Sequence, residues 1–286
     1  MLKSEILEDL ICLLPKIKDY HSPKTKLHSF LKKVSRKEVE NLFAEEEERV
    51  VSFDPFGTLV FPYYSMGAVD SLNLFDLDEL IIFSFYWANR KRYKNVLDLG
   101  ANIGLHSIIL DKCGYNVRSY EPDPIHFKRL KNNLELNNCL YVEAINAAIS
   151  YKSGEMDFIR VLGNTTGSHI AGSKHNPYGN LEKFPVKVES IEPMLEWADL
   201  VKMDIEGHEK EIFKNIPVDV WASSDVLLEV ENEKSANIIF ECFENSKMNL
   251  FSEKTGWLKI KRFSDMPKSY HEGSSFITHK PEMLWT

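Results

Sequence analysis

The segment NVLDLGANIGLHS, residues 95–107, decides the fold class of this 286-residue chain. An apolar run leads to Asp98, and Gly100 and Gly104 follow where an apolar helical pattern begins. Glycine at such a turn lets the backbone take left-handed torsions and approach a ligand closely. The segment therefore predicts a strand, a ligand-binding turn and a helix over residues 103–112.

Strands and helices alternate from residue 72 onward. The strand-like runs NVLDLG, NVRSYEP, DLVKMDIEG and DVLLEVE are each followed by a helical pattern. Short apolar strands separated by helices indicate parallel βαβ units, and such a sheet carries helices on both faces. We also predict a hairpin over residues 154–161, a strand in FPVKVESI and a final pair of strands, GWLKIKRF and SSFITH. Residues 72–286 are thus predicted to form one α/β domain.

Residues 1–71 are predicted to form an N-terminal extension. Apolar residues recur every four positions on one helical stripe, at Leu2, Ile6, Leu10 and Leu14. A second helix is predicted over residues 29–48, and VVSFDPFGTLVFPYY predicts two short strands around a turn. We expect the helices to pack on the main domain or to form a homo-oligomer contact, rather than to attach to a membrane.

Composition narrows the classes of function. A net charge of −8 argues against a broad contact with nucleic acid or with an anionic membrane. The four cysteines are far apart and form no C-x-x-C pair, which argues against a disulfide framework or a zinc site and favours a reducing compartment. No apolar run approaches the roughly 20 residues needed to span a bilayer. The chain is predicted to be cytoplasmic.

Glu121 follows the next predicted strand, in SYEPD, about 20 residues beyond Gly100. A carboxylate at this place can accept hydrogen bonds from both hydroxyls of a ribose. The turn lacks the G-K-[ST] of a P-loop and the G-x-G-x-x-G of a dinucleotide site, which disfavours a pyrophosphate ligand. An acid such as Asp98 is favourable beside a cationic sulfonium. These features point to S-adenosylmethionine, with an NAD-dependent oxidoreductase as the alternative.

The runs VLDLGANIG, YEPDP, LKNNLELNN, NAAIS and VKMDIEGHE, in this order, resemble the FkbM-type class I methyltransferases over roughly residues 72–278. The resemblance implies a Rossmann-like sheet with an antiparallel last strand and S-adenosylmethionine as cofactor. Asn102 stands where the wider class has a glycine, a departure that the FkbM branch tolerates. By position, the resemblance implies a methionine site at Asp98, Gly100, Asn102 and Gly104, a ribose site at Glu121, and an adenine neighbour at Asn146.

The run DLVKMDIEGHE gathers polar side chains at the end of a predicted strand. Methyl transfer requires an acceptor oxygen held in line with the departing sulfur, and a group that takes up its proton. We predict that Asp204 orients the acceptor or accepts its proton, with Glu206 and His208 assisting. Which of the three is the base stays open, because Glu206 and Glu209 could instead cap the next helix.

No metal site is assigned from the sequence. Asp204 and Glu229, which follow neighbouring predicted strands, leave a Mg²⁺ site open as an alternative.

The methyl acceptor is the least defined part of the prediction. Kinship implies a hydroxyl on a sugar, a glycan or a secondary metabolite; a methyltransferase-like binding module without catalysis is the alternative. DIEG replaces the [DN]-P-P-[FYW] expected of a nucleic-acid adenine methyltransferase, so nucleic acid is disfavoured. The polar loop of residues 162–180 suits a lid over the acceptor, with a disordered connector as the alternative, and its NPYG, residues 176–179, predicts a turn.

Overall fold

The computed structural model describes residues 1–174 and 179–285, and within them the central element is an eight-stranded sheet. Its strand order is β13-β12-β14-β11-β10-β3-β4-β5. Neighbouring strands from β11 to β5 are parallel, whereas β14 is antiparallel to β11. The predicted mostly parallel α/β sheet with an antiparallel last strand is therefore confirmed. The strands are β3 (Asn95–Leu99), β4 (Asn116–Tyr120), β5 (Val142–Ile145), β10 (Leu200–Met203), β11 (Asp225–Leu228), β12 (Asn249–Ser252), β13 (Leu258–Lys259) and β14 (Ser275–Thr278).

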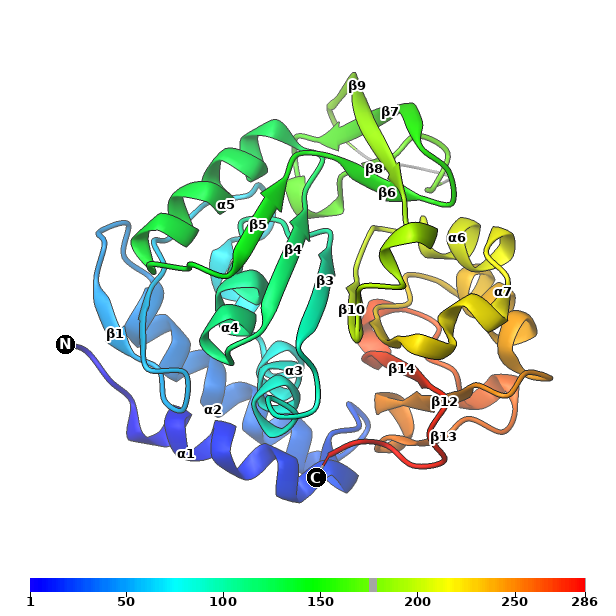
Figure 1. Cartoon of the computed structure of the whole chain (residues 1–286). Helices are drawn as coiled ribbons and strands as arrows, with labels where there is room; N and C mark the ends of the chain where they lie inside the picture. Colours follow the sequence, from blue (N-terminus) through cyan, green and yellow to red (C-terminus); the bar gives the residue numbers. More distant parts are fainter. Residues whose placement is uncertain (175–178, 286) are drawn as a thin grey trace.

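Helices cover both faces of this sheet, as predicted (Figure 1). Side chains alternate along each strand, so Val96 packs into one hydrophobic core and Leu97 into the other. The first core includes α3 (Leu77–Ala88), α4 (Leu105–Lys112) and α5 (Pro124–Leu136); the second includes α6 (Glu209–Asn215) and α7 (Glu233–Phe243).

The N-terminal segment adds helices and a two-stranded hairpin to the α3 side of the molecule (Figure 1). These elements are α1 (Glu5–Leu13), the 3₁₀ helix η1 (Leu14–Tyr20), α2 (Lys26–Phe43), β1 (Val50–Ser52) and β2 (Thr58–Val60). The prediction that the second helix reaches residue 48 is wrong, because α2 ends at Phe43. Four consecutive glutamates, residues 45–48, would face the negative end of the helix dipole.

A second, four-stranded sheet lies at the top of the molecule in Figure 1. Its order is β6-β9-β7-β8, from β6 (Ala148–Ser150), β7 (Gly154–Val161), β8 (His169–Ile170) and β9 (Leu181–Ser190). The predicted hairpin over residues 154–161 is wrong, because these residues form one strand that pairs along its whole length with β9. The final pair of strands is also corrected, since β12 lies between β13 and β14.

An aromatic contact joins the two ends of the described chain. The Trp285 ring lies 4.9 Å from the His21 ring and 5.6 Å from the Trp257 ring, centroid to centroid. The Trp257 indole N–H donates to His21 Nδ1 at 2.9 Å, and Ser22 Oγ donates to the Lys254 carbonyl at 2.6 Å. None of the described helices is long and apolar enough to cross a membrane.

Candidate active site

A cavity of ≈ 1040 Å³ opens where β3, β4, β10 and β11 end. Its wall also includes α2 residues and the loop that follows β7, the predicted lid, of which residues 175–178 lie outside the described part. The predicted site residues that line the cavity are Gly100, Asn102, Glu121, Asp204 and Glu206. Those outside its lining are Asp98, Gly104, Asn146 and His208.

The turn after β3 is shaped by packing within the protein. The backbone N–H groups of Gly100 and Ala101 both donate to the Tyr120 carbonyl at 3.0 Å. Gly100 has φ +76°, and a Cβ there would lie 1.8 Å from the Asp204 carbonyl oxygen. The glycine is therefore required because the ends of β3 and β10 touch. This contact brings the β3 turn and Asp204 to the same part of the cavity.

Glu121, after β4, lies at the cavity wall, where two backbone donors hold its carboxylate. Its carboxylate accepts from the N–H groups of Asn102 and Asp123, both at 2.8 Å. Burial raises the pKa of Glu121 to about 8, although these hydrogen bonds oppose the shift. Asn146 donates its amide to the carbonyls of Glu121 and Pro122, at 2.8 and 3.1 Å. Asn146 thus supports the loop that carries Glu121.

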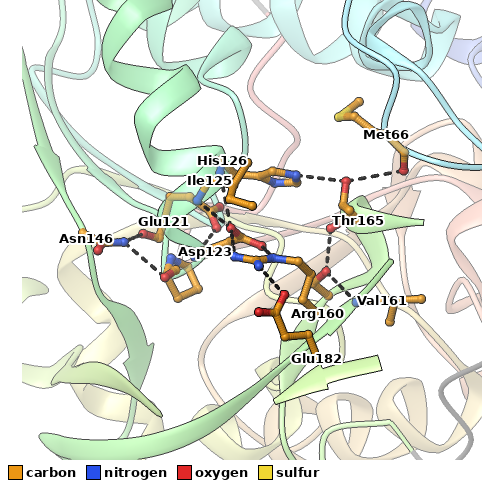
Figure 2. A network of polar contacts seen from close by, with 12 residues as sticks. Met66, Glu121, Asp123, Ile125, His126, Asn146, Arg160, Val161, Thr165 and Glu182 are labelled. Atoms are coloured by element: carbon orange, nitrogen blue, oxygen red, sulfur yellow. Dashed lines mark hydrogen bonds and ion pairs between the residues drawn. The ribbon is translucent and has the colours of Figure 1, made fainter. Parts of the chain in front are cut away.

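A buried ion pair, which the sequence did not reveal, anchors this loop to the second sheet. Arg160 on β7 donates to both carboxylate oxygens of Asp123, at 2.6 and 2.7 Å (Figure 2). The same carboxylate caps α5 by accepting from Ile125 N–H at 2.8 Å. Burial favours a higher pKa for Asp123, but Arg160 and the helix N–H groups bring it below its usual value. One signal was available: Arg160 and Phe158 share the buried face of the strand.

Arg160→Met is expected to lower the free energy of unfolding by about 3–5 kcal/mol, because Asp123 would remain buried without its partner. Urea denaturation followed by circular dichroism measures this difference. Lys183→Met is the matched control, since Lys183 forms an exposed pair with Asp157 on the same sheet. A loss for Arg160→Met no larger than for Lys183→Met would contradict the role given to the buried pair.

A buried lysine organises the carboxylates at the end of β10. Lys202 Nζ donates to the Gly100 carbonyl at 3.1 Å and lies 3.5 Å from Asp98 and 3.7 Å from Asp204. Burial lowers the pKa of Lys202, but the two aspartates outweigh it and raise the pKa overall. Asp98 is fully buried and also accepts from Ser107 Oγ at 2.6 Å. Lys202 therefore links Asp98, which does not reach the cavity, to Asp204, which does.

Further carboxylates surround Asp204 in the cavity. Glu206 has the left-handed φ of +57° and pairs with Lys174 of the loop, which also lies 3.1 Å from Glu231. Burial, followed by the charge of Asp204, raises the pKa of Glu206 to about 8. Glu229 lines the same cavity after β11, and burial raises its pKa well above the usual value. The lining at this place is strongly acidic.

His208 lies in the protein interior. Its Nε2 is 2.9 Å from Ser150 Oγ on β6, and its Nδ1 is 3.0 Å from Ser173 Oγ. The residue is 3% exposed, and burial lowers the pKa of its imidazole to about 4. This geometry suits a neutral ring that ties the β10–α6 turn to the second sheet.

Replacement of His208 by asparagine is expected to make the free energy of unfolding less dependent on pH under acidic conditions. A histidine whose pKa is lower in the folded state stabilises the fold above its unfolded value of about 6.5 and loses that contribution as the pH falls toward about 4. The variant lacks this titration, so its free energy of unfolding should fall less between these pH values. Urea titrations at both pH values test this, and parallel pH profiles would contradict it.

The sequence and the fold of this chain are similar to those of known proteins. The family described as Methyltransferase FkbM domain matches residues 98–256. Methyltransferase sdnD of Sordaria araneosa is 26% identical over an alignment 188 positions long that covers 53% of this chain and 67% of that protein. Hexuronic acid methyltransferase AglP of Haloferax volcanii is 27% identical over an alignment 138 positions long that covers 46% of this chain and 54% of that protein. The O-methyltransferase from Bacillus cereus, solved in complex with SAH, aligns with a TM-score of 0.39 and 10% identity over 68% of this chain and 78% of that chain.

Proposed function

This chain belongs to the family of methyltransferases with an FkbM domain, and from that premise we propose that it is an O-methyltransferase. The methyl donor is S-adenosylmethionine, and the acceptor is a hydroxyl group of a sugar, a glycan or a secondary metabolite. One observation carries the proposal: a carboxylate that two backbone N–H groups hold at the cavity wall, Glu121, follows the strand next to the β3 turn.

The residues of the cavity fit S-adenosylmethionine. Glu121 is placed to accept hydrogen bonds from ribose hydroxyls. Asn102 lines the cavity beside Glu121, to which its backbone N–H donates at 2.8 Å. The Asp204 carboxylate in the cavity wall favours a positively charged ligand. When bound, the cofactor supplies the methyl group on its sulfonium centre.

The chain's own residues would position the acceptor and receive its proton. Asp204 is the proposed base or orienting group, because it lines the cavity and its backbone contacts the cofactor turn. Lys202 is a positioning residue that holds Asp204 through their 3.7 Å ion pair. Glu206, which lines the same part of the cavity, is proposed to assist Asp204. His208 is proposed to hold the turn between β10 and α6 in place through its contact with Ser150.

The proposed acceptor class rests on the loop and on the relatives. The cavity lining includes Thr165, Thr166, Ser168 and Ser173 of the loop. The two serine hydroxyls are buried and bonded within the protein, whereas the half-buried Thr165 and Thr166 can hydrogen-bond a polyol. AglP, whose name describes a hexuronic acid methyltransferase, is consistent with a carbohydrate acceptor. We keep the division into an extension, residues 1–71, and a methyltransferase domain, residues 72–286, as part of the proposal, with a homo-oligomer through the N-terminal helices.

Calorimetry and a methyl-transfer assay test this function together. We expect the purified chain to bind S-adenosylhomocysteine and not NADH, and to transfer a labelled methyl group to members of a panel of sugars and hydroxylated metabolites. Binding of NADH alone would support the oxidoreductase alternative. Binding of S-adenosylhomocysteine without transfer to any acceptor of the panel would support a non-catalytic binding module.

A further inference from the structure

Three side chains of types that can bind a metal ion come together where the N-terminal extension packs against the main domain, and each comes from a separate element. They are His28 on α2, Asp78 at the start of α3, and Glu253 directly after β12. One ligand atom from each residue lies within 4.8 Å of the others, and His28 Nε2 is 2.7 Å from Asp78 Oδ1. Among the residues that the structure describes, this is the one group of three or more histidines, cysteines and acids that meets this spacing.

The Glu253 carboxylate is buried with half of its hydrogen-bonding capacity unused. The residue is 0% exposed, and its Oε2 accepts from the Ser274 N–H at 2.7 Å. Its Oε1 is also buried and has no hydrogen-bond partner among the described residues. A Cβ on Gly273 would lie 2.6 Å from Oε2, so the glycine leaves the space that this carboxylate fills. A buried carboxylate oxygen without a partner, beside a histidine and an aspartate, can bind a cation or accept a hydrogen bond.

We propose that His28, Asp78 and Glu253 bind one divalent transition-metal ion, of the class represented by Zn²⁺. An imidazole nitrogen with two carboxylates is a ligand set for such ions, whereas Ca²⁺ and Mg²⁺ are bound mainly through oxygen. Lys32 lies 3.2 Å from Asp78 Oδ2, and Asp78 Oδ1 contacts His28 Nε2 at 2.7 Å, a contact that the ion would replace by binding both atoms. The absence of closely spaced cysteines in the sequence does not bear on this site, because no cysteine takes part.

The proposed ion would fasten the extension to the main domain next to the cavity. His28 and Asp78 line the cavity, and Glu253 does not. Three protein ligands leave a fourth position of a tetrahedral zinc ion for water or for a group in the cavity. The ion would therefore lie at the part of the cavity wall formed by α2 and the start of α3. This proposal is independent of the methyl-transfer function.

Zinc titration of the full chain after removal of metals with EDTA and dialysis tests the site. We expect calorimetry to show one tight equivalent of Zn²⁺ and the melting temperature to rise when Zn²⁺ is added. His28→Ala and E253Q are each expected to weaken that equivalent by about 100-fold, as loss of one of three ligands implies. His279→Ala is the matched control, because His279 is exposed and distant in sequence from the three ligands.

E253Q separates a metal site from a cluster of hydrogen bonds without metal. Glutamine keeps the size of the side chain and an oxygen for the Ser274 N–H, so the variant should fold, which circular dichroism checks. If the three residues bind no ion, E253Q and the parent chain will show the same zinc titration, and the proposal is overturned. Absence of a one-to-one equivalent in the parent chain, or its retention in His28→Ala, overturns it as well.

Discussion

Asp204→Asn is expected to reduce the turnover number for methyl transfer by about 10²–10⁴-fold, the usual contribution of a positioned general base. The amide has nearly the same shape as the carboxylate but cannot accept a proton. Asp204 lines the cavity, and its ion pair with the buried Lys202 at 3.7 Å fixes its place. The substitution leaves the backbone contact between Asp204 and Gly100 intact, so cofactor binding should persist.

Initial rates with labelled S-adenosylmethionine and calorimetry with S-adenosylhomocysteine separate the two effects. Asp219→Asn is the matched control, because Asp219 is exposed and follows α6 in the sequence. This variant should retain full turnover. Unchanged turnover in Asp204→Asn would remove this residue from the mechanism. A large drop in Glu206→Gln alone would then move the role of base to Glu206.

Above pH 8, where its carboxylate is charged, Glu121→Gln is expected to weaken binding of S-adenosylhomocysteine by about 100-fold. Two ribose hydroxyls would lose a charged acceptor, and hydrogen bonds to charged groups contribute about 1.5–3 kcal/mol each. The carboxylate also accepts from Asn102 and Asp123, whereas an amide turns its own N–H₂ group toward one of these donors. The substitution therefore weakens both the ligand contact and the loop that supports it.

The pH dependence of binding gives a second measurement on the same residue. Because the pKa of Glu121 is raised to about 8, the charged carboxylate becomes more populated as the pH rises through that value. Calorimetry should therefore show tighter binding as the pH approaches and passes about 8 in the parent chain, with a flatter profile in Glu121→Gln. Glu143→Gln, exposed on the neighbouring strand β5, is the control. Equal affinities of Glu121→Gln and Glu143→Gln would contradict the ribose role.

The motifs at strand ends were predictable because they are local. The glycine turn, Glu121 and Asp204 each follow an apolar run within a few residues, and the parallel sheet rule places them at one edge. The alternation of strands and helices was equally visible, and so the fold class followed from the sequence. The reason why residue 100 must be a glycine was not predictable, because the atom that excludes a Cβ there belongs to Asp204, which follows another strand.

Features that depend on pairing across long stretches of sequence were not predictable. Arg160 meets Asp123 across 37 positions, and β7 pairs with β9 across the loop between them. Lys202 carries a charge inside a strand, which the sequence pattern does not distinguish from a solvent-facing lysine. His208 presented the same difficulty, because its two serine partners come from separate segments.

The aromatic contact between the two ends of the described chain, called here the aromatic seam, affects how the polypeptide reaches its native state. The residues of this seam are His21, Ser22, Lys254, Trp257 and Trp285. Two of its hydrogen bonds connect residues that lie far apart in the sequence, with separations of 232 and 236 positions. The entropy of closing such a long loop opposes their formation. Contacts of such high order form slowly, and we expect this aromatic seam to close after the central sheet has condensed. Until then its tryptophans stay accessible to water, and such transiently exposed apolar surface makes a folding intermediate prone to aggregation.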